Sequence, residues 1–127
     1  MDLRHLDELA RLEASYWWHK AKRELVVEWL VRRFPPPARL IEAGCGPGGT
    51  LAALAGVGYE VAGFDALPEA VERCRGLGLR RVAVHDVQCP WPPLGGPVNA
   101  VLMLDVLEHL DDPVQALRHA ARALAPG

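Results

Sequence analysis

The stretch from Leu40 to Gly49, which reads Leu-Ile-Glu-Ala-Gly-Cys-Gly-Pro-Gly-Gly, decides how this chain folds. The apolar run Arg39–Ala43 predicts a short strand, and a helix is expected over Thr50–Ala55. Glycine adopts backbone angles that other residues avoid and lets the backbone approach a ligand closely. The N–H groups at the start of the following helix would face the same ligand. A strand, a glycine-rich turn and a helix in this order therefore predict a ligand site.

The rest of the main domain alternates strands with helices. Further strands are expected over Glu60–Phe64, Val82–His85 and Ala100–Leu104, and a further helix over Pro68–Leu77. A loop rich in proline and glycine, Cys89–Pro97, precedes the fourth strand. That strand is almost entirely apolar, as is typical of a parallel strand covered on both faces. Alternation of this kind predicts an α/β fold with a parallel sheet, right-handed crossovers and three Rossmann-like αβα layers.

A last helix is expected to begin near Pro113. Either Asp111 or Asp112 can cap its first turn, and proline is favourable just inside a helix start. The apolar residues at helical spacing predict its core face, which would consist of Val114, Leu117, Ala121 and Leu124.

The residues before this domain are predicted to be helical over 2–34. Leucine recurs about every third residue at Leu3, Leu6, Leu9 and Leu12, and a second apolar set contains Leu25, Val26, Trp29 and Leu30. The prolines at 35–37 would end the second helix. The chain is accordingly divided into a helical segment, 1–37, and a ligand-binding domain, 38–127.

Composition is that of one ordinary globular domain. The chain has 127 residues, is 50% hydrophobic and carries a formal net charge of −2. No apolar stretch approaches the length of a membrane span, and no signal peptide is expected at the start. The widely spaced cysteines form no metal-ligand pattern, which indicates reduced thiols in a cytoplasmic protein. The basic residues Lys20, Lys22, Arg23, Arg32 and Arg33 are interpreted as a solvated helix face rather than a nucleic-acid site.

Asp65 narrows the class of ligand. It closes the second strand 21 residues after Gly44, where an acidic side chain can accept hydrogen bonds from both ribose hydroxyls of a nucleoside. The glycines Gly44, Gly46 and Gly49 also satisfy the dinucleotide pattern G-x-G-x-x-G. An adenosine-containing ligand is therefore expected, and both NAD and S-adenosylmethionine fit the pattern to this point.

Further acidic residues favour the second ligand. Glu42 precedes the first glycine, where a carboxylate can orient a cationic methionine moiety, and Asp86 follows the third strand in the sequence His85-Asp86-Val87. The fourth strand continues into Leu102–Pro113, which reads Leu-Met-Leu-Asp-Val-Leu-Glu-His-Leu-Asp-Asp-Pro. With these motifs, residues 39–125 resemble the class I S-adenosylmethionine-dependent methyltransferases of the small-molecule branch, types 11, 12 and 23. The aromatic stretch Tyr16–Lys20 also resembles the segment preceding the domain in some of these proteins.

The resemblance implies roles for individual residues. Asp65 would hold the ribose, Asp86 would accept a hydrogen bond from the adenine amino group, and His109 would lie near the transferred methyl group as a candidate base. The residues implied in cofactor binding are Glu42, Gly44, Cys45, Gly46, Gly48, Asp65, Ala66, Leu67, Asp86, Val87, Leu104 and Asp105. The implied cofactor is S-adenosylmethionine, with S-adenosylhomocysteine (SAH) as its product, and no metal is implied.

The sequence departs from the family pattern in two respects. Val98-Asn99 replaces the usual Phe-Asp, which would weaken a local structural contact. The family's sheet has strand order 3-2-1-4-5-7-6, but this chain supplies strands only as far as the fourth. Val101–Leu104 would then form an apolar edge, which we expect to be covered by a second copy of the chain, by the amino-terminal helices or by a partner chain.

Three functions remain open at this point. The first is a methyltransferase acting on a small molecule. The second is a non-catalytic S-adenosylmethionine-binding module, or a fragment of a longer enzyme. The third is an NAD-binding Rossmann domain, which Glu42, Asp86 and the pair Glu108-His109 disfavour.

Overall fold

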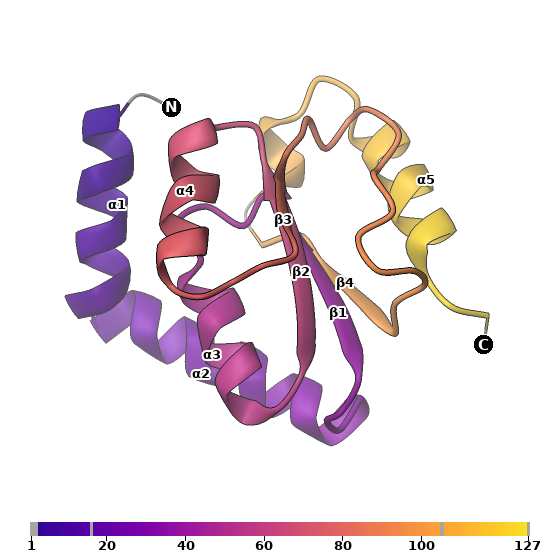
Figure 1. The fold of residues 1–127 in the computed structure, drawn as a ribbon, viewed down its shortest axis with the longest axis horizontal. Helices are drawn as coiled ribbons and strands as arrows, with labels where there is room; N and C mark the ends of the chain where they lie inside the picture. The colour runs from indigo at the N-terminus through magenta and orange to yellow at the C-terminus, as the bar shows by residue number, and fades with distance from the viewer. Residues whose placement is uncertain (1–2, 16, 105, 127) are drawn as a thin grey trace.

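A computed structural model describes residues 3–15, 17–104 and 106–126 of the chain. Two helices come first, strands then alternate with helices as far as the third strand, and a loop without a helix joins the third strand to the fourth (Figure 1). The elements are α1 (Leu3–Ser15), α2 (Trp17–Arg33), β1 (Arg39–Ala43), α3 (Gly49–Val57), β2 (Glu60–Asp65), α4 (Pro68–Gly76), β3 (Val82–Val84), β4 (Ala100–Leu102), a 3-10 turn η1 (Leu107–His109) and α5 (Pro113–Ala123).

The strands form one parallel sheet in the order β3-β2-β1-β4. β1 is central, with Leu40 beside Val61 of β2 and beside Ala100 of β4. Because all strands run in the same direction, the segments that follow them meet at one edge of the sheet. This arrangement confirms the predicted α/β class and the predicted order of the first four strands.

The sheet is covered by helices on both faces. In Figure 1, α1 to α4 lie on one side of the strands and α5 lies on the other. On the α5 side, Ile41 and Phe64 pack with Ala116. On the opposite side, Leu51 and Val71 form one apolar cluster, and Leu30 of α2 joins another. The amino-terminal helices therefore contribute directly to the core.

The fourth strand is shorter and less buried than predicted. β4 covers only Ala100–Leu102, and all of its residues are half-buried. Its register pairs these residues with Leu40–Glu42 of β1, which ends at Ala43, and the next residue, Gly44, still donates its N–H to the Phe64 carbonyl of β2. With β1 ending there, Met103 and Leu104 have no neighbouring strand among the described residues. β4 also lies at the edge of the described sheet, which explains its partial exposure.

The predicted core face of α5 is wrong. Val114 and Leu117 are 54% and 50% exposed, and Ala121 is also exposed. Leu124 lies beyond the helix, in extended backbone that bridges to Val98. The buried residues are instead Ala116, His119 and Ala120. Alanine at two of these positions lets the helix lie close to the sheet, and Ala116 packs in the same cluster as Ile41 and Phe64.

The apolar sets of the amino-terminal helices are only partly buried. Leu6 of α1 and Leu30 of α2 are fully buried, whereas Leu3, Leu25 and Trp29 are exposed. The Leu12 side chain lies outside the described residues. Part of the apolar surface of α2 is therefore not buried against the core. No helix among the described residues has the length and apolar content needed to span a membrane.

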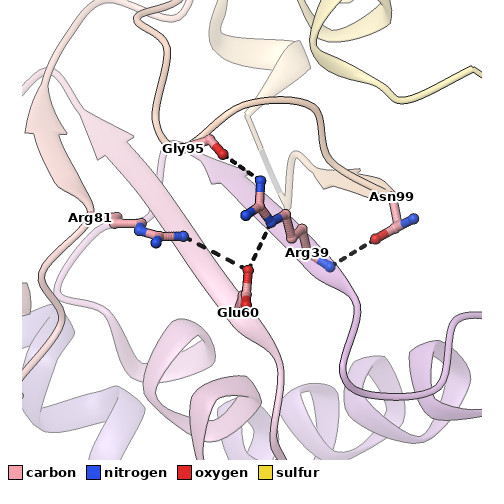
Figure 2. Close-up of polar contacts among 5 residues, drawn as sticks. All are labelled: Arg39, Glu60, Arg81, Gly95 and Asn99. Carbon is pink, nitrogen blue, oxygen red and sulfur yellow. Dashed lines mark hydrogen bonds and ion pairs between the residues drawn. The ribbon is translucent and has the colours of Figure 1, made fainter.

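A cluster of polar residues joins the strand starts to the loop before β4 (Figure 2). The Arg39 guanidinium donates to Glu60 at 2.8 Å and to the Gly95 carbonyl, and Arg81 lies 3.9 Å from the same Glu60 carboxylate. The Asn99 side chain accepts from the Arg39 N–H at 2.8 Å, and the Asn99 N–H donates to the Arg39 carbonyl. Asn99 therefore makes a local contact here, although the resemblance implied that its replacement of Asp would weaken one.

Candidate functional site

The carboxyl ends of the strands border a cavity of about 390 Å³, here called the main cavity. Its wall combines the glycine turn, the tips of β2 and β3, the segment after β4 and part of the amino-terminal helices. The lining residues are Leu9, His19, Lys22, Arg23, Val26, Glu42, Gly44, Cys45, Gly46, Pro47, Thr50, Asp65, Ala66, His85, Asp86, Val87, Leu104, Val106, His109 and Leu110. In an open α/β sheet this crevice is where ligands bind.

Glycine is required in the turn by its geometry. Gly44 has φ +77°, and a Cβ atom there would lie 2.7 Å from a methyl group of Val106. Gly48 has φ +91° and occupies the N-cap position of α3, where a Cβ atom would lie 2.9 Å from the Cys74 sulfur. Gly46 has φ +55°, but open space surrounds its Cβ position. The turn is therefore tightly packed at its two ends and open toward the main cavity in its middle.

Asp65 fixes the turn from the neighbouring strand. One carboxylate oxygen accepts the Gly46 N–H at 2.9 Å, and the other accepts the Leu67 N–H at 3.0 Å. Each carboxylate oxygen has more than one lone pair, so these bonds leave acceptor capacity toward the main cavity. Asp65, the residue expected to bind the ribose, therefore also has a structural role, because it holds the glycine turn against the tip of β2.

Two further carboxylates line the main cavity at different depths. Glu42 is only 4% exposed and lies at the end of β1. Asp86 is exposed, follows β3 and accepts the Gln88 N–H at 2.9 Å. The structure therefore brings Glu42, Asp65 and Asp86 to one cavity, as the sequence predicted. Such an arrangement suits a ligand with cationic or hydroxyl groups along its length.

Basic residues of α2 lie in the same wall, and the sequence interpretation missed them. From the sequence, Lys22 and Arg23 are expected to lie on a solvated helix face, but both line the main cavity together with His19. Arg32 instead pairs with Glu28 at 2.7 Å, and Arg33 stacks over Trp29 at 4.8 Å. No local pattern separates these two kinds of basic residue, because only the packing of α2 against the domain decides which of them border the main cavity.

Cys45 is held as a neutral thiol. Its sulfur lies 3.8 Å from that of Cys74, and both residues are buried. The hydrogen bond to Cys74 and burial raise the pKa of Cys45 far above its usual range, and the nearby Glu42 and Asp65 carboxylates raise it further. Since the thiolate is the nucleophilic form, Cys45 is a small packing residue of the turn rather than a nucleophile.

Only some of the remaining predicted site residues line the main cavity. Ala66, Val87, Leu104 and His109 line the main cavity, whereas Gly48 and Leu67 are not among its lining residues. Leu67 instead precedes α4 and donates its N–H to Asp65. Asp105 lies outside the described residues. The His109 side chain is largely exposed, and its Nε2 lies 3.7 Å from a carboxylate oxygen of Glu108.

Comparison with known proteins tests the family resemblance that the sequence motifs indicate. The sequence family described as a methyltransferase domain matches residues 17–127. The ubiquinone biosynthesis O-methyltransferase of Xanthomonas campestris is 31% identical over 139 residues, which cover 96% of this chain and 56% of that protein. The chain thus spans about half the length of this curated relative.

Solved structures share the fold. The magnesium protoporphyrin IX methyltransferase of Synechocystis with bound SAH is 27% identical, with a TM-score of 0.69 over 84% of this chain and 52% of that chain. The sugar N-methyltransferase of Streptoalloteichus is 26% identical, with a TM-score of 0.76 over 94% of this chain and 49% of that chain. Because the family match extends over most of the sequence and the fold agrees with it, this chain belongs to the methyltransferase domain family.

Proposed function

We propose that the chain binds S-adenosylmethionine in the main cavity and is the donor-binding part of a methyltransferase that acts on a small molecule. The observation that carries this proposal is the distribution of charge around the main cavity. Acidic residues line it from the sheet, and the basic residues Lys22 and Arg23 line it from α2. A ligand that carries an ammonium, a sulfonium, a ribose and a carboxylate needs both kinds of partner.

The dimensions and the donor set of the main cavity fit this ligand. A volume of about 390 Å³ lies within the range of small-molecule sites. Open space at Gly46 leaves the backbone accessible to the ligand. Asp65 has acceptor capacity for ribose hydroxyls, and Ala66 and Val87 offer apolar surface for a flat ring. NAD would need room and donors for a pyrophosphate, whereas Glu42 places a buried carboxylate two residues before the first glycine of the turn.

Methyl transfer from a sulfonium requires mainly that the protein align the methyl group with the acceptor. When bound, the cofactor supplies a methyl group on an activated sulfonium. Glu42 and the glycine turn would bind and orient the amino-acid end, and Leu9 and Val26 of the helical segment would exclude water from the main cavity. If the acceptor must lose a proton, His109 Nε2 would take it, since its exposed position leaves it reachable by a second ligand.

We infer that the acceptor is a small molecule, because the related methyltransferases described above are named for ubiquinone biosynthesis, for magnesium protoporphyrin IX and for a sugar. We also infer that another polypeptide surface covers β4, either a second copy of the chain or a partner. The edge of β4 leaves the backbone groups of Val101 without a further strand among the described residues. Free thiols at all three cysteines accord with the reducing cytoplasm, where we place the protein.

The cofactor assignment is tested by calorimetric titration of the chain with SAH and, separately, with NADH. We expect SAH to bind with a dissociation constant below about 100 μM and NADH to show no heat. Saturable binding of NADH without binding of SAH would overturn the proposal. Methyl transfer from labelled S-adenosylmethionine to a metabolite extract then separates an active enzyme from a module that only binds the cofactor.

The inference about β4 has its own test. Sedimentation velocity should show a dimer or, in the presence of its partner, a complex, and hydrogen exchange at the Val101 and Leu102 amides should be slow. A stable monomer whose β4 amides exchange freely would show that this edge needs no cover.

A further inference from the structure

Two segments that border the main cavity come from opposite edges of the sheet. The first, here called the β3 wall, follows β3 and contributes Asp86 and Val87. The second, here called the β4 wall, follows β4 and contributes Val106, His109 and Leu110. β3 and β4 are the edge strands of the described sheet, with β2 and β1 between them. Pairing of neighbouring strands therefore does not fix the distance between the two walls.

The β3 wall is part of an ordered loop. The Gln88 N–H donates to an Asp86 carboxylate oxygen at 2.9 Å. The Trp91 indole N–H donates to the Val87 carbonyl at 2.8 Å, and the Trp91 ring packs edge-on against Phe64 with centroids 4.9 Å apart. The orientation of the Asp86 carboxylate is thus tied to the backbone of Gln88.

The β4 wall is a second ordered unit. The His109 N–H donates to the Val106 carbonyl at 3.0 Å, which closes the 3-10 turn η1. The segment then continues into α5, where the Asp112 carboxylate accepts the Gln115 N–H at 3.1 Å and caps the helix. The position of His109 therefore depends on where the start of α5 is held.

The side chain of Gln88 joins the two units. Its Oε1 accepts the Asp112 N–H at 2.7 Å. Because a backbone N–H can only donate, the amide oxygen of Gln88 must be the atom that faces Asp112. Gln88 thus donates to Asp86 on one side and accepts from Asp112 on the other, although it does not itself line the main cavity.

We propose that Gln88 is a positioning residue that sets the distance between the β3 wall and the β4 wall. This role rests on the proposed function, under which Asp86 accepts from the adenine amino group and His109 lies near the transferred methyl group. Gln88 touches neither part of the cofactor. It orients the Asp86 carboxylate through its N–H, and it holds the start of α5 through its Oε1.

The expected effect on binding follows from the cost of ordering. A ligand that touches both walls binds more tightly when their spacing is already fixed, because no binding free energy is used to order them. A single hydrogen bond between uncharged groups contributes modestly in water. Loss of the contact between Gln88 and Asp112 should therefore weaken binding about fivefold rather than abolish it.

Hydrogen exchange on the full chain without ligand tests the contact itself. Gln88→Met keeps the length of the side chain but removes the acceptor oxygen. We expect the Asp112 amide to exchange about fivefold faster in this variant, since it loses its hydrogen-bond partner. Gln88→Glu keeps an acceptor oxygen at the same reach and should restore slow exchange.

Calorimetric titration with SAH tests the positioning role. We expect Gln88→Met to bind SAH about fivefold more weakly than the parent chain and Gln88→Glu to regain most of the affinity. Gln115→Met is the matched control, because Gln115 is the other glutamine of the chain and contacts Asp112 through its backbone N–H, which the substitution keeps. Its affinity for SAH should equal that of the parent chain.

The outcomes separate this role from the function on which it rests. Faster exchange and weaker SAH binding in Gln88→Met, both reversed in Gln88→Glu and absent in Gln115→Met, support it. Unchanged exchange of the Asp112 amide in Gln88→Met would overturn the contact, and unchanged SAH affinity despite faster exchange would overturn the positioning role. Equal losses in Gln88→Met and Gln88→Glu would also overturn it, because they would not depend on the acceptor oxygen. No SAH binding by the parent chain would instead overturn the proposed function and, with it, the part of Gln88 in that function.

Discussion

The two ends of the sheet use the same kinds of charged residue in opposite ways. At the carboxyl end, Glu42, Asp65 and Asp86 border an open cavity, with basic residues of α2 across from them. At the amino end, Arg39 and Arg81 share the Glu60 carboxylate, and these groups hold the loop before β4 (Figure 2). Charges paired with one another secure the chain, whereas charges arranged around a cavity suit a ligand.

Backbone geometry reinforces this difference. The carboxyl end turns on glycines with positive φ, and a Cβ atom at two of them would contact side chains at less than 3 Å. At the amino end, Asn99 and Arg39 exchange two hydrogen bonds between ordinary residues. Substitutions at the carboxyl end should therefore lower the free energy of unfolding more than substitutions at the amino end. They should also affect ligand binding.

The largest effect on stability is expected for Gly44→Ala. Its φ of +77° is unfavourable for alanine, and its Cβ atom would lie 2.7 Å from Val106. Strain in the left-handed region and overpacking together should lower the free energy of unfolding by about 3 kcal/mol, measured by urea denaturation. Gly46→Ala is the control, because its Cβ position is open, and it should cost only about 1 kcal/mol. Equal losses in the two variants would show that the contact with Val106 does not constrain the turn.

Asp65→Ala should produce the largest loss of cofactor affinity. The substitution removes the acceptor of the Gly46 N–H and, under the proposed function, the ribose partner. We expect SAH to bind about 100-fold more weakly in calorimetric titration, on the scale of lost hydrogen bonds to a charged group. Glu60→Ala removes a carboxylate from the other end of the same strand and should leave the affinity unchanged. A similar loss in both variants would mean that the effect on binding arises from general destabilisation.

The sequence predicted the elements and the acidic side of the main cavity because both follow from local chemistry. Arg39–Ala43 forms the predicted strand with the predicted bounds, since a short apolar run before a glycine turn has few alternatives. Asp65 and Asp86 reach the same cavity because each follows a parallel strand, and parallel strands end at one edge. For these residues, the position along the chain already determines the position in space.

The predictions that were wrong concern which face of a helix is buried, because this depends on what packs against the helix. α5 has two apolar sets at helical spacing, and the smaller residues, including Ala116 and Ala120, are the ones that meet the sheet. In the sequence, nothing distinguishes Lys22 and Arg23 from the other basic residues of α2, and only the packing of the helix shows that they line the main cavity. Periodicity indicates that a helix has faces, but the shape of the opposing surface selects the one that is buried.

Asn99 offers a smaller test at the amino end. Asn99→Ala removes the acceptor for the Arg39 N–H and should lower the free energy of unfolding by about 1 kcal/mol, measured by urea denaturation. Asn99→Asp keeps an acceptor oxygen at the same place and restores the residue that the family resemblance implies there. It should lie within about 0.5 kcal/mol of the parent chain. If the aspartate variant were as unstable as the alanine variant, the contact would depend on the amide group rather than on the acceptor oxygen.

The smallest effect is expected for the ion pairs of Glu60. Glu60→Gln weakens the pairing with Arg39 at 2.8 Å and with Arg81 at 3.9 Å, but these side chains are about half exposed. Exposed pairs contribute little because water competes with each partner and ordering long side chains costs entropy, so a loss of about 0.5 kcal/mol is expected in dilute buffer. The loss should vanish in about 1 M NaCl, where screening acts over a few ångströms. A loss that persisted at high salt would place the contribution of Glu60 in a directional hydrogen bond to the Arg39 guanidinium, and the amino end would then share the geometric constraint found at the carboxyl end.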